Sequence, residues 1–209
     1  MSAPSVTNVS SPEGVDDKSK RRFLVAATSV VGAVGVGFVA VPFVKSLQPS
    51  AKTRAAGAPV EADISKLELG QRMIVEWRGK PIWIVRRSEK NLADLKTITD
   101  LQDANSDVVQ QPEYAKNEYR SIKAEYAVLI GICTHLGCSP SFLTEEDPQA
   151  KSLRPDWKGG FFCPCHGSFF DLAGRVYKGV PAPTNLVVPP YTFLSDTRIL
   201  VGVDHKGAA

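Results

Sequence analysis

The sequence predicts a mainly β head domain behind a single N-terminal membrane helix, and three patterns support this fold class. An uncharged apolar run covers Phe23–Val44, close to the about 20 residues needed to cross a bilayer core. From residue 60 onward, short apolar stretches alternate with polar turns that contain glycine or aspartate, which is typical of strands. Between these parts, residues 45–59 are small and polar without apolar periodicity, the composition of a linker that could be a passive tether or a hinge.

The first 22 residues are expected to remain in the cytoplasm. Residues 18–22 are Lys-Ser-Lys-Arg-Arg, and the next positive charge is Lys45, behind the apolar run. By the positive-inside rule, everything after Lys45 then lies outside, in the periplasm of a bacterium. The stretch Ser19–Leu24 is similar to a twin-arginine export signal. Because the apolar run is longer than that of a cleaved signal, we expect residues 23–44 to be retained as an anchor.

Residues 60–209 are expected to form one periplasmic domain built mainly from strands. Two hairpins are predicted, formed by Met73–Trp77 with Pro81–Val85 and by Tyr191–Ser195 with Arg198–Val203. The apolar run Tyr126–Ile132 should lead into a cysteine-containing loop. A short helix is predicted from Ser88 to Lys96, with Ser88 as its N-cap. The polar residues 100–120 and 141–160 are expected to be loops.

The charge distribution argues against a nucleic-acid-binding protein. The net charge is only +3, and most of the excess lies beside the membrane segment. No basic patch with interleaved aromatic residues is present, which nucleic-acid binding would require. The sequence also contains no glycine-rich loop that would cradle a phosphate.

Cysteine and histidine cluster in two short loops, and this is the strongest chemical signal. All four cysteines and two of the three histidines lie in Cys133-Thr-His135-Leu-Gly-Cys138 and Cys163-Pro-Cys165-His166. Each loop offers one cysteine and one histidine at short spacing, together with one extra cysteine. Two thiolates on one iron and two imidazoles on the other form the ligand set of a Rieske [2Fe–2S] cluster. The extra pair of cysteines is then free to cross-link the loops.

Other arrangements of the same residues fit less well. A structural zinc site prefers Cys-x(2–4)-Cys spacing, and Cys163-Pro-Cys165 is tighter than that. A plant-type cluster needs Cys-x4-Cys-x2-Cys; Cys133 and Cys138 match the first step, but no cysteine follows at the second. Two plain disulfides beside idle histidines are the remaining alternative.

The two loops resemble the cluster-binding boxes of the Rieske iron–sulfur subunits of ubiquinol–cytochrome c reductase, the bacterial respiratory cytochrome bc complex. Gly179-Val-Pro181-Ala-Pro183, followed by Asn185-Leu186, resembles the proline loop that covers the cluster in this family. Rieske ferredoxins and ring-hydroxylating oxygenases lack the two extra cysteines, which this chain has. The resemblance covers nearly the whole chain. It implies an antiparallel β-sandwich head with a small cluster-binding subdomain at about residues 131–183.

The resemblance also implies roles for individual residues. The expected cluster ligands are Cys133 and Cys163 on the buried iron and His135 and His166 on the outer iron. A disulfide is expected between Cys138 and Cys165, which suits an oxidising compartment.

Further roles follow from the same resemblance. The hydroxyl of Ser168 should bond a bridging sulfide, and Phe170 stands where high-potential relatives carry a tyrosine that bonds a ligand cysteine. Leu136 and Gly137 should form a tip that docks on cytochrome b. The proline loop, with Gly179, Pro181 and Pro183, should shield the cluster.

The function implied is that of the catalytic iron–sulfur subunit of a quinol–cytochrome c reductase. The subunit would take one electron from ubiquinol, accept the proton through His166, and pass the electron to cytochrome c1, contributing to proton translocation. Expected partners are cytochromes b and c1 in a dimeric complex of the inner membrane. The alternative is a Rieske electron carrier that stands alone or serves an oxidase of the arsenite-oxidase type, because such carriers can share the export signal and the disulfide.

Overall fold

The computed structural model describes residues 17–204, and the chain divides into two units, Met1–Ser50 and Ala51–Ala209. Residues 1–16 of the expected cytoplasmic segment and residues 205–209 of the expected head lie outside the described part. We describe the anchor and the head separately.

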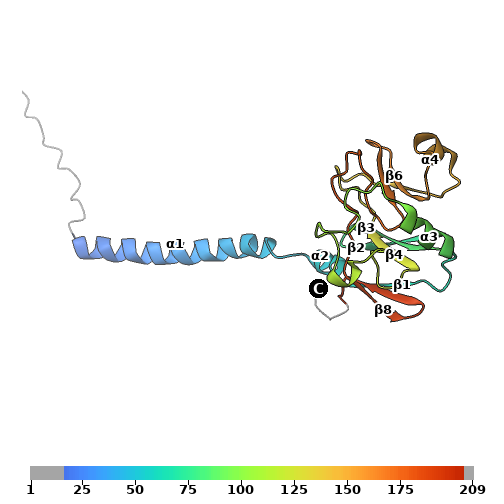
Figure 1. Ribbon diagram of the computed structural model, residues 1–209. Coiled ribbons are helices and arrows are strands. Elements are labelled where there is room, and N and C mark those ends of the chain that lie inside the picture. The colour runs from blue at the N-terminus through green and yellow to red at the C-terminus, as the bar shows by residue number, and fades with distance from the viewer. Residues whose placement is uncertain (1–16, 205–209) are drawn as a thin grey trace, which may run out of the picture. The chain divides into compact units, whose positions relative to one another are not determined.

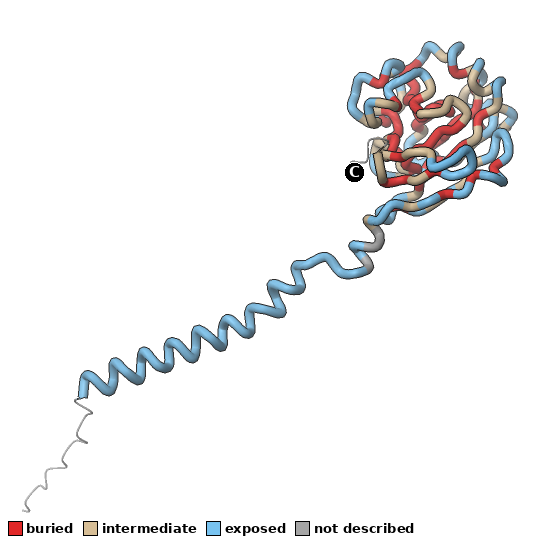
Figure 2. Tube along the Cα trace, turned by 90° about the horizontal axis from the view of Figure 1, so that it is seen from below, coloured by how far each residue is buried: buried red, intermediate tan, exposed pale blue. Residues whose placement is uncertain are grey.

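A single long helix, α1, makes up the described part of the first unit. It spans Lys18–Ser46, and Asp17 caps it by accepting hydrogen bonds from the backbone of Ser19 and Lys20 at 3.1 and 3.2 Å. Its 29 residues would extend about 44 Å, and its most apolar window has a mean hydropathy of 2.2. Figure 2 shows it exposed along its whole length. The helix is therefore long and apolar enough to cross a bilayer, and it extends beyond the predicted span at both ends.

The expected linker is not entirely irregular, because a short helix, α2, occupies Ala51–Ala56 within it. Alanine, lysine and arginine dominate this stretch, and they are among the strongest helix formers. Gly57 and Pro59 follow, and both residue types favour the end of a helix. The overall composition of residues 45–59 concealed this local helical preference.

The head is built from three antiparallel sheets of three strands each, which confirms the predicted mainly β fold. The first sheet contains β1 (Val60–Asp63), β9 (Arg198–Val201) and β8 (Tyr191–Ser195). The second contains β2 (Arg72–Trp77), β3 (Lys80–Arg86) and β4 (Tyr126–Ile130). The third contains β5 (Ser141–Leu143), β6 (Gly160–Cys163) and β7 (Ser168–Asp171). In Figure 1 the second sheet lies between the other two.

Both predicted hairpins are present. Trp77 pairs with Lys80, so the turn between β2 and β3 consists of Arg78 and Gly79. Both turn residues have positive φ, 52° and 69°, as a two-residue turn that follows the strand twist requires. The second hairpin turns at Asp196-Thr197 as expected, but β9 ends two residues early, at Val201.

The predicted helix is present as α3 (Glu89–Thr97), with Ser88 as N-cap in a reciprocal capping box with Asn91. The expectation of loop for residues 141–160 is wrong, because β5 and a second helix, α4 (Pro148–Leu153), lie there. Asp147 caps α4, and Pro148 occupies its first turn, a start signal that the polar composition hid. Residues 100–120 are irregular apart from an isolated antiparallel β-bridge between Leu101 and Tyr177 and one 3-10 turn, Glu113–Ala115.

The cysteine-bearing sheet is joined to the central sheet by aromatic packing. The ring of Trp83 on β3 stacks on Phe161 of β6, with centroids 4.8 Å apart. Gly131, between β4 and the first cysteine loop, lies directly against this indole, and a Cβ atom there would overlap the ring. Trp77, Trp83 and Trp157 are all buried, as expected for packing residues. The base of the first loop is therefore fixed by close packing.

Replacing Gly131 by alanine should lower the free energy of unfolding of the protein by about 1–3 kcal/mol, because the added methyl group must displace Trp83. Denaturant unfolding followed by tryptophan fluorescence measures the change. Gly57→Ala is the control, since its Cβ would meet nothing closer than 3.5 Å. Equal stability of the two variants would contradict the packing described above.

Candidate metal centre

The first cysteine loop follows β4 and is closed by two backbone hydrogen bonds. The amide of Cys133 donates to the carbonyl of Cys138 at 2.8 Å, and the amide of Gly137 donates to the carbonyl of Cys133 at 3.1 Å. Gly137 has a φ of 83°, which other residues adopt only at a cost. Leu136 is 70% exposed at the end of this loop, as expected for a tip.

The second loop joins β6 to β7 and repeats the same closure. Cys163 pairs with Ser168 across the hairpin, and the amide of Gly167 donates to the carbonyl of Cys163 at 2.9 Å. Gly167 has a φ of 79°. In both loops, therefore, a glycine in the left-handed region bonds back to the cysteine four residues earlier. The histidine of each loop lies within this shared turn, His135 in the first loop and His166 in the second.

A disulfide between Cys138 and Cys165 joins the two loops, as predicted. Its Cα atoms are 6.8 Å apart, and 27 positions separate the residues in sequence. Cys133 and Cys163 stay free, and both are buried. The sulfurs of Cys138, Cys163 and Cys165 lie within 4.8 Å of one another. Because two of these three sulfurs are bonded to each other, Cys133 and Cys163 are the cysteines able to supply thiolates.

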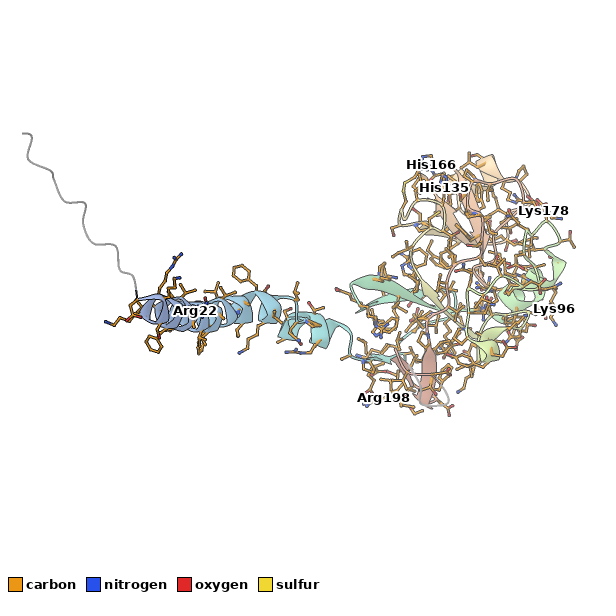
Figure 3. The ribbon with its side chains drawn as sticks, turned by 90° about the vertical axis from the view of Figure 1, so that its left-hand side faces the viewer. Arg22, Lys96, His135, His166, Lys178 and Arg198 are labelled. Atoms are coloured by element: carbon orange, nitrogen blue, oxygen red, sulfur yellow. A yellow bond between two sulfur atoms is a disulfide. The ribbon has the colours of Figure 1, made fainter. Side chains whose placement is uncertain are left out.

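The two loop histidines lie together at the outer side of the loops. The ring centroids of His135 and His166 are 4.8 Å apart and the rings meet edge to face at 87°, as their neighbouring labels in Figure 3 indicate. His166 is exposed and His135 is half-buried, whereas both free cysteines are buried. The two sulfur donors therefore face inward and the two nitrogen donors face outward.

The surroundings of the free cysteines favour a bound cation. Burial raises the pKa of the Cys133 thiol, and the neighbouring Cys163 adds to this effect, while hydrogen bonds from the His135 amide and the Ser168 side chain oppose it. Thiolates bind metals, so two adjacent buried thiols become stable anions when a metal compensates their charge. Two such sulfurs with two imidazoles match the donor set of a Rieske [2Fe–2S] cluster. The residues present fit that group.

A third segment packs against both loops. The amide of Ala182 donates to the hydroxyl oxygen of Ser168 at 3.0 Å, and the hydroxyl of Thr134 donates to the carbonyl of Thr184 at 2.7 Å. Ser168 and Ala182 are buried. Gly179, Pro181 and Pro183 lie on the exposed side of the same segment. The structure thus places the predicted proline loop beside the cysteine loops.

Sequence reasoning missed the residues that hold this segment in place. The side chain of Gln102 donates to the carbonyl of Pro183 at 2.9 Å. The buried Asn185 accepts from the amide of Val176 at 2.8 Å and donates to the carbonyl of Asp103 at 2.9 Å. Gln102 and Asp103 come from a stretch expected to be loop. Because the bonds to Pro183 and from Asn185 to Asp103 join residues about 80 positions apart, no local pattern could have indicated them.

Phe170 is fully buried in β7, where it pairs with Phe161. It shares one hydrophobic cluster with Cys133 and Cys163, whereas its neighbour Phe169 packs in a different cluster around Trp157. Alternation along the strand explains the difference, since successive side chains point to opposite faces. Phe170 therefore lies on the face of β7 that packs into the cluster containing the free cysteines, and its side chain has no hydroxyl.

Comparison with known proteins gives consistent results along the chain. The family described as "Rieske [2Fe-2S] domain" matches residues 59–192. Residues 10–50 match "Ubiquitinol-cytochrome C reductase Fe-S subunit TAT signal".

Three relatives carry the description "Ubiquinol-cytochrome c reductase iron-sulfur subunit". The protein of Allochromatium vinosum is 62% identical over 95% of this chain and 95% of its own length. That of Blastochloris viridis is 45% identical over 89% of this chain and 94% of its own. The protein of Rhodospirillum rubrum is 40% identical over 92% of this chain and 96% of its own length.

Removing the disulfide by the double change Cys138→Ala and Cys165→Ala should lower the free energy of unfolding by about 3–4 kcal/mol, as loop closure over this separation predicts. Thermal or denaturant unfolding under non-reducing conditions measures the loss. Leu136→Ala, in the same loop but exposed, should change stability by less than about 0.5 kcal/mol. A double variant as stable as the native protein would refute the structural role of the cross-link.

Proposed function

The chain belongs to the Rieske iron–sulfur subunits of ubiquinol–cytochrome c reductase, and on that premise we propose how its residues serve the complex. The two linked loops hold the [2Fe–2S] cluster of this family through four donors, Cys133, Cys163, His135 and His166. The observation that carries this assignment is the segregation of donors, with the free cysteines buried and His166 exposed. Cys133 and Cys163 would hold the cluster from the core side, and His135 and His166 would hold it from the surface side.

His166 is the residue that meets the quinol. It is the more exposed of the two loop histidines, so its outer ring nitrogen can accept a hydrogen bond from a quinol hydroxyl. When bound, the cluster would supply the electron-accepting chemistry of this family, at a potential of roughly −150 to +300 mV. The hydroxyl proton passes to the ring nitrogen of His166 as the electron leaves the quinol. The chain thereby contributes a catalytic group to the reductase.

Leu136 and Gly137 form the surface that docks on cytochrome b. Leu136 is 70% exposed, and an apolar side chain held out at the end of a rigid loop is typical of a contact surface. The two glycine-closed turns and the disulfide fix this tip relative to His166. Docking of Leu136 would bring the histidine to the quinol site and exclude water there.

The apolar helix α1 anchors the chain in the bacterial inner membrane, with the head in the periplasm. The basic residues before the span favour a cytoplasmic N-terminus, and the disulfide suits the periplasm. The linker then acts as a hinge, letting the head move between the quinol site on cytochrome b and the acceptor cytochrome c1. We place the subunit in a dimeric complex on the analogy of its family.

A paramagnetic resonance spectrum of dithionite-reduced membranes tests this function. We expect a Rieske-type signal that changes when an inhibitor occupies the quinol site, and co-purification of the chain with cytochromes b and c1. A signal that ignores the inhibitor, in a chain that purifies without these cytochromes, would instead identify a free-standing electron carrier.

Phe170→Tyr should raise the midpoint potential of the cluster, because the new hydroxyl can donate a hydrogen bond to a ligand sulfur and stabilise the reduced state. A redox titration followed by paramagnetic resonance measures the shift. Phe169→Tyr is the matched control, since it adds the same group on the opposite face of β7 and should leave the potential unchanged. No rise, or a fall, in Phe170→Tyr would contradict the proposed tuning.

Leu136→Asp should slow quinol oxidation about tenfold, equivalent to about 1.4 kcal/mol, because it places a charge in an apolar contact. The cluster signal and its midpoint potential should stay close to those of the native complex. Leu153→Asp is the control, because Leu153 on α4 is also exposed, at 53%, but belongs to neither loop. Native turnover in Leu136→Asp would show that the tip does not dock.

A further inference from the structure

The head buries more positive than negative charge. Four charged side chains are buried among the described residues, namely Arg87, Arg120, Arg175 and Asp171. Arg175 pairs with Asp171 at 2.7 Å. Arg87 and Arg120 form no ion pair in the part of the chain that the structure describes. Asp171 and, less strongly, Asp103 are the carboxylates that favour the charged form of Arg120, and Asp103 is only partly buried.

Arg120 is held entirely by uncharged oxygens. One guanidinium nitrogen donates to the carbonyls of Ala173 and Gly174 at 3.0 and 3.4 Å. The other donates to the carbonyl of Leu186 at 2.8 Å and to the side-chain oxygen of Gln111 at 2.9 Å. The remaining Nε has no partner. Burial lowers the pKa of Arg120 to about 10, so the side chain still carries its charge at neutral pH.

A short chain of contacts leads from Arg120 to the metal centre. Leu186, whose carbonyl Arg120 bonds, is two residues beyond Thr184, a distance of at most about 7 Å. The carbonyl of Thr184 accepts from Thr134 at 2.7 Å, and Thr134 is adjacent to Cys133. The guanidinium therefore lies within about 27 Å of the Cys133 sulfur along this path, an upper limit set by chain reach. Arg120 and Cys133 are both buried, so salt screens an interaction between them only weakly.

We propose that Arg120 is a fixed buried cation that raises the tendency of the cluster to accept an electron, while anchoring the end of the proline loop. Reduction adds a negative charge to the centre, and a nearby positive charge in a low-dielectric interior stabilises the reduced form. The inference rests on the proposed cluster site at the two loops. It assigns to Arg120 an electrostatic role that its hydrogen bonds alone would not require.

Three variants, made in the intact membrane complex, distinguish the effect of the Arg120 charge from the effect of its hydrogen bonds. Arg120→Met removes both, and Arg120→Lys keeps the charge but loses the forked hydrogen bonds. Gln111→Glu preserves the shape of the partner and places a compensating carboxylate against the guanidinium. Arg198→Met is the control, because Arg198 is an exposed arginine on β9 whose side chain is 57% exposed.

Redox titration by paramagnetic resonance should give a lower midpoint potential for Arg120→Met and for Gln111→Glu. The expected fall in the reduction equilibrium constant is about three- to tenfold, or about 28–59 mV for one electron. Arg120→Lys should keep the native potential while its thermal unfolding temperature falls. Arg198→Met should change neither quantity.

Native potentials in Arg120→Met, or a fall in Arg120→Lys as large as in Arg120→Met, would overturn the proposal. Should Arg120→Met fail to fold, Gln111→Glu decides the question, because an unchanged potential in that variant also overturns it. Loss of the Rieske signal from the native protein would refute the proposed site itself, which is a different outcome.

Discussion

The disulfide between two irregular loops is the constraint on which the site depends. The first loop lies outside the sheets, and of the second only Cys163, the last residue of β6, belongs to one. In each loop a glycine amide donates a hydrogen bond back to the carbonyl of the first cysteine. Joining Cys138 to Cys165 fixes the two turns relative to each other and leaves one free cysteine and one histidine on each. The sorting of sulfur inward and nitrogen outward follows from that link together with the strands that lead into it. A molecule that approaches the loops from outside then meets imidazole and not thiolate.

Packing of aromatic side chains below the loops also fixes the positions of the two cysteine loops. The stack of Trp83 on Phe161 joins the sheet that carries the second loop to the central sheet, whose last strand leads into the first loop. The segment 179–185 closes the third side through hydrogen bonds to Ser168 and Thr134. Each loop thus receives its position from two independent elements. Such redundancy suits a centre whose donors must keep their places through repeated changes of charge.

Part of the site could be predicted from the residues themselves, because the spacing of cysteine and histidine within each loop is a local property. The disulfide, which joins residues 27 positions apart, and the exposed tip at Leu136 were expected only from the family resemblance. The hairpins and α3 were also predictable, since turn and cap signals are local. The helix α4 was missed because Asp147-Pro148 was hidden in polar sequence. The bonds of Gln102, Asn185 and Arg120 were beyond reach, because their partners are distant in the chain.

The helix α2 would allow the length of the proposed hinge, residues 45–59, to change. Its six residues cover about 9 Å when helical and about 20 Å when extended. An isolated helix of this length is marginal in water, so if residues 45–59 act as the proposed hinge, unwinding α2 would lengthen the connection by about 11 Å. Movement of the head could then use this additional length, which a linker without a helix would not provide.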